Sequence, residues 1–255
     1  MELVDVSKEY LTADGPLRAL ERISLSIGEG EFVSLLGPSG CGKSTLMLIA
    51  AGLVAPSSGS VRIGGREISA PYGNVGIVFQ DANLYEWRRV LENVLLPAEI
   101  QGLDLRRHRQ RALELLELVG LGGFERKRPY QLSGGMRQRV ALCRALVHDP
   151  ALLLMDEPFG ALDALTRDQM NVELQKLWQA NRKTVLFITH SITEAVLLSD
   201  RVIVMSPRPA RIGASFEIDL PRPRSLDFAE MPEFGRYTRQ IRDLFKSWGV
   251  LKASV

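Results

Sequence analysis

The sequence predicts an α/β protein with a three-layer core, in which a parallel sheet lies between layers of helices. Short apolar runs recur along the chain, and continuous runs of this kind are typical of parallel strands that are buried on both faces. Helical stretches separate the later runs, as in βαβ units. In addition, a glycine-rich loop stands between one such run and a helix-forming stretch.

The strands of the parallel sheet are expected where the apolar runs are nearly unbroken. These runs are 31–36, 76–79, 151–155, 184–188 and 201–205. Helices are expected near 164–181 and 191–199, between the last of these strands. This alternation of strand and helix is what places a parallel sheet at the centre of the molecule.

A second β layer is expected around the glycine-rich loop. Residues 3–6 and 23–27 read as strands, and 60–68 reads as a hairpin around a Gly-Gly turn. Together they predict an antiparallel β subdomain. A Pro-rich piece, 207–223, leads to a last amphipathic segment near 227–248.

The stretch 86–150 reads as a helical insert that ends in glycines and a further helix. Its RRHRQR run is either a phosphate or lipid patch or a solvated helix face, and the solvated face is favoured. His108 and His148 are expected on helix surfaces. The predicted domains are an α/β core with its β subdomain (1–85 and 151–220), a helical subdomain (86–150) and a C-terminal extension (221–255).

The composition is that of an ordinary globular protein. Of 255 residues, 45% are hydrophobic and 24% are charged. The 32 basic and 30 acidic side chains nearly balance, so the chain lacks the excess of positive charge that is typical of nucleic-acid-binding proteins. The two cysteines, Cys41 and Cys143, have no partner at the sequence spacing of a metal site, and the chain has no disulfide framework. This favours a protein of a reducing compartment. We expect neither a signal peptide nor a membrane span, because no apolar run approaches about 18–20 residues.

The glycine-rich loop has the pattern G-x-x-x-x-G-K-[ST] of a phosphate-binding loop. It consists of Gly37, Pro38, Ser39, Gly40, Cys41, Gly42, Lys43, Ser44 and Thr45. Glycines let backbone N–H groups turn inward to an anion, and the following helix adds its positive end. Lys43 is expected at the β- and γ-phosphates and Ser44 on Mg²⁺. The alternative is a chance glycine turn. We also expect a thiol reagent to attack Cys41 and ATP to protect it.

The run ALLLMDEP predicts a strand that ends in two acids, Asp156 and Glu157. Acids at the carboxyl end of a parallel strand face the ligand crevice. Asp156 is expected in the Mg²⁺ shell and Glu157 as general base for a water. The alternative is a helix that starts with two acids.

Ser133, Gly134 and Gly135 open another helix. A capping hydroxyl, unpaired N–H groups and the helix dipole can bind a second anion, although a plain N-cap explains the same residues.

The chain resembles the ATP-binding subunits of ABC transporters, which have a P-loop NTPase (RecA-like) core. The resemblance rests on LSGGMRQR, LLLMDEP, ALD and a Thr-His pair, in that order, and covers about residues 3–220. It implies roles for matching residues: an adenine-stacking Tyr10, the Walker A loop 37–45, the Q-loop Gln80, the signature motif with Ser133, Gly134 and Gly135, the Walker B Asp156, the catalytic Glu157, the D-loop Asp163 and the switch His190. Gln80 would also touch Mg²⁺.

The resemblance implies ATP and Mg²⁺ as cofactors and a homodimer in which each ATP lies between the loop of one copy and Ser133 of the other. It further implies a separate multi-span permease, an indirect solute-binding protein and a place on the cytoplasmic face of the inner membrane. The segments FITHSITEA and VMSPRP resemble the nitrate/sulfonate/taurine importer group, which includes pyrimidine thiamine-precursor systems.

Several alternatives stay open at this level. A soluble ABC ATPase without transport would need a second cassette or a coiled-coil insert, and neither is visible. A nucleotide sensor without turnover would not need Glu157 and His190. In the segment 84–87, either Leu84, Tyr85 and Trp87 form an apolar groove that docks a permease, or Trp87 lies in the core.

Overall fold

The computed structural model describes residues 1–13 and 15–251, which form two compact units. Of the described residues, 1–72 (without residue 14) and 178–251 belong to the first unit, and 73–177 belong to the second. Residues 252–255 of the predicted C-terminal extension lie outside the described residues. Within the described residues, no helix combines the length and the apolar character needed to cross a membrane.

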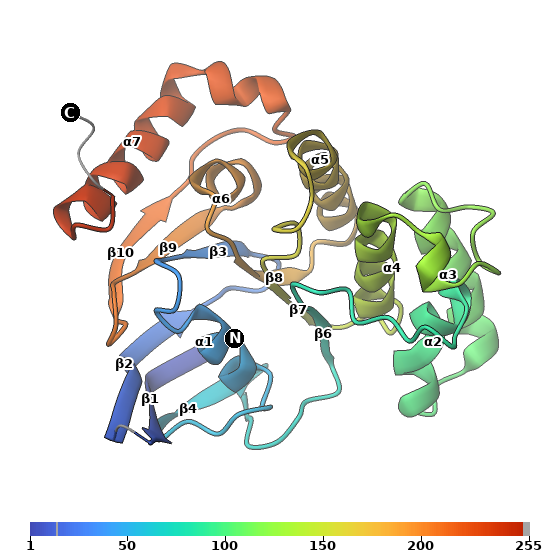
Figure 1. Cartoon of the computed structure of the whole chain (residues 1–255), viewed down its shortest axis with the longest axis horizontal. Coiled ribbons are helices and arrows are strands. Elements are labelled where there is room, and N and C mark those ends of the chain that lie inside the picture. Colours follow the sequence, from blue (N-terminus) through green and yellow to red (C-terminus); the bar gives the residue numbers. More distant parts are fainter. Residues whose placement is uncertain (14, 252–255) are drawn as a thin grey trace. The chain divides into compact units, whose positions relative to one another are not determined.

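The first unit contains the central parallel strands. Strand β3 (Phe32–Leu36) pairs in parallel with β8 (Thr184–Ile188) on one side and β9 (Arg201–Met205) on the other. All residues of β3 and β8 are buried, because helices cover both faces. Helix α6 (Ile192–Leu198) lies on one face and α1 (Lys43–Ala50) on the other (Figure 1). These predicted strands and the predicted layers are confirmed.

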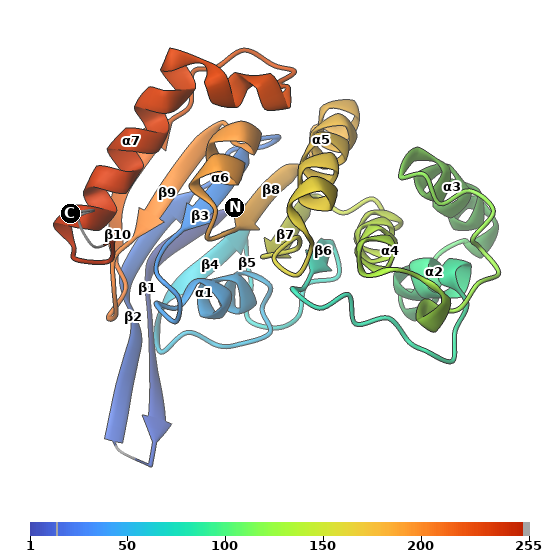
Figure 2. The same ribbon diagram turned by 45° about the horizontal axis from the view of Figure 1, so that its top comes forward.

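An antiparallel sheet completes the first unit, in the order β2-β1-β4-β5. Its strands are β1 (Glu2–Thr12), β2 (Gly15–Ser26), β4 (Ser58–Ile63) and β5 (Arg66–Glu67). Strands β1 and β2 form a long ribbon (Figure 2), longer than the short strands that the sequence predicts. The Gly-Gly turn between β4 and β5 is confirmed: Gly64 and Gly65 have φ values of 57° and 75°.

The Pro-rich piece 207–223 contains a strand that its sequence does not predict. Strand β10 (Ile212–Glu217) pairs antiparallel with β9. Its residues alternate between half-buried and exposed, but flanking prolines and short length hide this pattern in the sequence.

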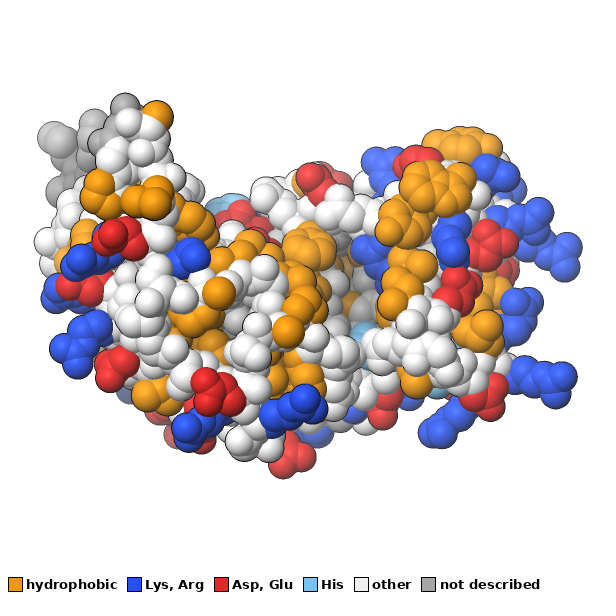
Figure 3. All heavy atoms as spheres, turned by 90° about the horizontal axis from the view of Figure 1, so that it is seen from below, with side chains coloured by type: hydrophobic (Ala, Val, Ile, Leu, Met, Phe, Trp, Pro, Cys, Tyr) orange, Lys and Arg blue, Asp and Glu red, His pale blue; other side chains and the backbone are white. Residues whose placement is uncertain are grey.

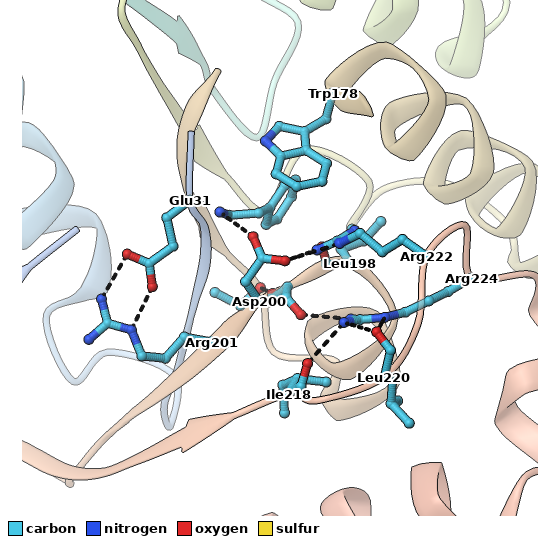
Figure 4. Close-up of polar contacts among 12 residues, drawn as sticks. Glu31, Trp178, Leu198, Asp200, Arg201, Ile218, Leu220, Arg222 and Arg224 are labelled. Carbon is cyan, nitrogen blue, oxygen red and sulfur yellow. Dashed lines mark hydrogen bonds and ion pairs between the residues drawn. The ribbon is translucent and has the colours of Figure 1, made fainter. Parts of the chain in front are cut away.

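The C-terminal helix α7 (Pro232–Ser247) packs on α6 through Phe234, Tyr237, Ile241 and Phe245. The chain reaches α7 through a segment that two arginines attach to the end of α6 (Figure 4). Arg222 pairs with Asp200 at 2.8 Å and lies over the Trp178 ring. These contacts fix the start of the extension.

Arg224 is 2% exposed and lies deeper than Arg222. Its guanidinium donates to backbone carbonyl oxygens, at 2.6 Å to Ser199, 2.8 Å to Val196 and 3.1 Å to Ile218 (Figure 4). Burial lowers the pKa of Arg224 to about 10, so it remains charged at neutral pH. The carbonyls at the carboxyl end of α6 carry partial negative charge and suit this cation.

The second unit holds β6 (Val75–Val78) and β7 (Leu152–Asp156), which pair in parallel. Its helices are α2 (Val90–Ile100), α3 (Leu105–Leu118) and α4 (Gly134–Leu146). Helix α5 (Ala164–Asn181) begins in this unit and ends in the first.

The first three arginines of α3 lie on a solvated face, as favoured from the sequence, whereas Arg111 is half-buried and pairs with Asp149 at 2.8 Å. Arg106, Arg107 and Arg109 are exposed, while Ala112 and Leu116 are buried. The space-filling view shows Lys and Arg side chains gathered over the helical part of this unit (Figure 3). His148 is not a helix-surface residue as predicted, since both of its ring nitrogens are buried.

Candidate nucleotide-binding site

The phosphate loop turns tightly between β3 and α1. The Cys41 N–H donates to the Pro38 carbonyl at 3.3 Å, which closes a β-turn. Gly40 occupies the third position of this turn with φ of +72°, the value that a type II turn requires and that glycine adopts without strain. The strand–loop–helix context of the predicted loop is therefore confirmed.

Lys43 is the first residue of α1 and is 6% exposed. Its ammonium donates to the carbonyl oxygens of Gly37 at 2.9 Å and Pro38 at 3.1 Å. The positive charge is thus held over the loop, and phosphate oxygens could take the place of these carbonyls. Ser44 is exposed in the first turn of the same helix, where a hydroxyl can reach a metal ion.

Tyr10 lies beside the end of the phosphate loop, although the two are far apart in sequence. Its hydroxyl donates to Thr45 Oγ1 at 3.5 Å, and Lys8 Nζ lies 5.1 Å from its ring centroid. Strand β1 therefore brings an aromatic ring to the loop, which fits a base-stacking role.

The expectation that a thiol reagent attacks Cys41 is not supported by the structure. Cys41 is 2% exposed, and burial raises the pKa of its thiol. The side chain points into the core, and only its backbone belongs to the phosphate cradle. The loop pattern alone does not show which way this side chain points.

His190 stands between β8 and α6, on a segment fixed by its neighbours. Thr189 donates through its hydroxyl to the Glu194 carboxylate, and its Oγ1 accepts the Ser191 N–H at 3.0 Å. Ser191 Oγ in turn accepts the Glu194 N–H at 3.3 Å as the cap of α6. Sequence reasoning missed these positioning residues, although the S-x-x-E pattern of a capped helix start could have indicated them.

Asp156 and Glu157 follow one another at the end of β7, as predicted. Glu157 has φ of +44°, in the left-handed region that side chains other than glycine rarely adopt. The Gly160 N–H donates to its carbonyl at 3.0 Å and helps to hold this conformation. Backbone strain of this kind is concentrated at functional sites.

Asp163 caps α5 in the second unit. Its carboxylate accepts the Thr166 N–H at 3.0 Å and the Thr166 hydroxyl at 2.7 Å. These hydrogen bonds lower the pKa of Asp163. The carboxylate is therefore charged and oriented at neutral pH.

The predicted signature helix start is present at α4. Ser133 Oγ accepts the Met136 N–H at 3.3 Å, and both Ser133 and Gly134 are exposed. Further along this helix, the buried Gln138 donates to the Phe79 carbonyl at 3.1 Å. It thereby holds the segment that leads to the exposed Gln80, a contact that the sequence did not indicate.

The predicted site residues are divided between the two units. The first unit brings together Tyr10 and the loop 37–45, and it also carries His190. The second unit carries the remaining ones: Gln80, Ser133, Gly134, Gly135, Asp156, Glu157 and Asp163.

A parallel α/β core, a phosphate loop with a buried lysine and a strand that ends in two acids define a nucleotide-binding protein of the phosphate-loop class. The family model described as "ABC transporter" matches residues 20–160. The chain therefore belongs to the ABC transporter family, and it is an ATPase that hydrolyses ATP to ADP and phosphate.

Individual relatives match over most of their length. An uncharacterized ABC transporter ATP-binding protein of Methanocaldococcus jannaschii is 48% identical over 246 residues, which are 96% of this chain and 91% of that protein. The taurine import ATP-binding protein TauB of Burkholderia pseudomallei (strain 1710b) is 48% identical over 237 residues, 93% of this chain and 88% of that protein.

A solved structure shares the fold. It is described as the dimeric structure of a post-hydrolysis state of the ATP-binding cassette MJ0796 bound to ADP and Pi. The TM-score is 0.76 at 35% identity, with 86% of this chain and 99% of that chain covered. The predicted phosphate-loop α/β core with an antiparallel β subdomain is confirmed, and the antiparallel strand β10 makes its sheet mixed rather than purely parallel.

Proposed function

We propose that this chain is the ATP-hydrolysing subunit of an importer for taurine-class solutes. The observation that carries the proposal is the likeness, over nearly the whole chain, to proteins named as taurine import ATP-binding proteins. Nitrate, other sulfonates and pyrimidine thiamine precursors are the competing solutes within the same group. The chain would act as a peripheral subunit at the cytoplasmic face of the membrane.

In the proposed reaction, Lys43 binds the β- and γ-phosphates, and the N–H groups of the loop surround them. Tyr10 stacks on the adenine ring. Glu157 orients and deprotonates the attacking water, and His190 contacts the γ-phosphate. Catalysis then consists mainly of positioning and of stabilising the charge that develops on the transferred phosphoryl group.

Magnesium fits the oxygen donors of the proposed site. Ser44, Gln80 and Asp156 offer a hydroxyl, an amide and a carboxylate, the ligand types that Mg²⁺ accepts. Among the described residues, no group of three or more His, Cys, Asp or Glu side chains could hold a metal ion. Phosphate oxygens would complete the shell, and the ion would neutralise charge on the β- and γ-phosphates.

A second copy of the chain would supply the other half of each nucleotide site. The start of α4, with the exposed Ser133 and Gly134 and the half-buried Gly135, presents a capping hydroxyl and the positive end of a helix. Residues 86–150 would form the subdomain that carries this helix start. Asp163, at the D-loop, would lie at the dimer interface.

The permease would dock on two exposed aromatic residues of the second unit. Tyr85 and Trp87 stack with ring centroids 4.7 Å apart and are 39% and 69% exposed, which excludes a core tryptophan. The fully buried Asn93 accepts the Tyr85 N–H at 2.7 Å and donates to its carbonyl at 3.1 Å. A fixed, exposed aromatic pair fits a protein interface.

Transport by the complete assembly tests the proposed solute. The chain is reconstituted in liposomes with the permease and the solute-binding protein encoded beside it, and uptake of taurine is compared with uptake of nitrate and of an alkanesulfonate. Taurine uptake that depends on ATP is expected. Uptake of nitrate alone would reject the taurine class, and an active ATPase that never assembles with a permease would favour the non-transport alternative.

A substitution tests the docking surface separately. Trp87→Ala should prevent co-purification with the permease while the isolated chain keeps its ATPase activity. Ile100→Ala is the matched control, since Ile100 is 76% exposed in the same unit and has no assigned role. Equal co-purification of both variants with the permease would reject the aromatic pair as the docking surface.

A further inference from the structure

The turn between β9 and β10 is closed by its own hydrogen bonds. The Ser206 N–H donates to the Arg211 carbonyl at 2.9 Å, and the Arg211 N–H donates to Ser206 Oγ at 3.0 Å. These bonds join the two ends of the turn 206–211, which carries Arg208 near its middle. The turn therefore has a defined backbone although most of its residues are exposed.

The turn is also attached to strand β2. The Ala210 N–H donates to the Ala19 carbonyl at 3.1 Å, and the Glu21 N–H donates to the Ala210 carbonyl at 2.9 Å. Arg211 adds an ion pair with Glu21 at 2.9 Å. The turn lies beside β2 in both ribbon views (Figures 1 and 2). It consequently forms a fixed base for side chains that reach away from it.

From this base, Arg208 reaches the phosphate loop. Its Nε lies 3.1 Å from the Gly40 carbonyl oxygen, and its Nη2 donates to the same oxygen. The peptide plane joins this carbonyl rigidly to the Cys41 N–H, which donates to Pro38. Because Arg208 fixes the direction of the Gly40 carbonyl, it also fixes the Cys41 N–H on the other side of the same peptide. Arg208 thereby stabilises the β-turn 38–41, which shapes the loop.

Strand β2 supports the same loop at Gly42. A Cβ atom on Gly42 would lie 2.8 Å from Leu20 Cδ2 and 3.3 Å from the Ala19 carbonyl oxygen. Leu20 is fully buried, so this support cannot move away easily. Since Ala19 also anchors the 206–211 turn, β2 braces the loop at Gly42 and, through Arg208, at Gly40.

We propose that Arg208 is a positioning residue, which keeps the phosphate loop in its nucleotide-binding shape before the nucleotide arrives. The inference rests on the proposed binding of ATP phosphates at this loop. A loop that is already ordered loses less conformational freedom on binding, and this raises its affinity. Arg208 need not touch the nucleotide to have this effect.

Arg208→Ala should raise the KM for ATP roughly fivefold and change kcat less than twofold, because a charged hydrogen-bond donor to the loop is lost. Arg208→Lys keeps a cation and a donor and should restore much of the affinity. Arg66→Ala removes an exposed arginine from β5 and is the matched control, with KM expected to be unchanged.

Hydrogen exchange separates positioning from direct contact. Without nucleotide, Arg208→Ala should speed amide exchange in peptides that cover 37–42, whereas Arg66→Ala should not. A KM within twofold of wild type would overturn the proposal. So would a raised KM with unchanged exchange in the nucleotide-free chain, which would instead indicate that Arg208 contacts the phosphates.

Lys43→Ala distinguishes a failure of the proposed site from a failure of this inference. It should abolish binding of a fluorescent ATP analogue. If it does not, the loop is not the nucleotide site, whatever Arg208 does.

Discussion

At Cys41, the position in the loop and the direction of the side chain lead to opposite chemical expectations. The backbone lies in the phosphate cradle, but the thiol is 2% exposed and burial raises its pKa. A thiolate is the reactive form, so a raised pKa slows alkylation. Iodoacetamide at pH 7.5 should leave Cys41 unmodified in the native chain and label it in urea, as read from the mass of tryptic peptides.

Cys143 serves as the internal reference for this experiment, because it is also fully buried with a raised pKa. Rapid labelling of Cys41 alone in the native chain would show that the loop opens and exposes the thiol.

His148 should make the chain less stable in mild acid. Burial, together with His108 and Arg111, lowers the pKa of His148, and the Val75 backbone and the charge of Asp149 oppose this only partly. The unfolded chain then binds the proton more tightly than the folded chain, so stability falls as the pH drops below about 6.5. Relative to His148→Gln, the wild type should lose unfolding free energy between pH 7 and pH 5.

The measurement is urea denaturation of both proteins at several pH values. Parallel curves for wild type and variant across this range would contradict the assignment.

At the scale of elements, Arg224 joins the C-terminal extension to α6. Arg224→Ala leaves the buried carbonyl oxygens of Val196, Ser199 and Ile218 without this donor. We expect the free energy of unfolding to fall by about 3 kcal/mol, since unpaired buried polar groups are costly. Urea denaturation measures the change.

Arg242→Ala is the control for this loss, because Arg242 lies exposed on α7. It should change stability by less than about 0.5 kcal/mol. Equal denaturation midpoints for the two variants would mean that the extension does not depend on Arg224.

At the scale of the whole molecule, the proposed site becomes complete only when two copies meet. Glu157→Gln keeps the size and the hydrogen-bonding reach of the side chain but removes the base. Two copies should therefore still close around ATP, while hydrolysis stops. The variant should therefore form a dimer with ATP, as measured by size exclusion with light scattering. A strictly monomeric variant at saturating ATP would contradict the proposed dimer.

Much of the fold could be predicted because its signals are local. The buried strands are continuous apolar runs, and β3, β8 and β9 lie where those runs do. The loop 37–45 and the acids after β7 are recognisable because their chemistry needs those residue types at that spacing. The sequence does not reveal strand β10, because its apolar pattern is short. The strand depends more on pairing with β9 and on the side chains around it.

Residue type and local hydrogen bonding control the strand–loop–helix unit and the order of the motifs, so these features, and with them the family, can be read from the sequence. The folded chain alone shows that Cys41 points inward, that Trp87 is exposed, and that Arg208 and Arg224 hold backbone carbonyls far away in the chain. Such contacts depend on which surfaces meet after folding. A residue's sequence neighbours do not contain that information, since an arginine in a Pro-rich run can serve equally well in solvent or in the core.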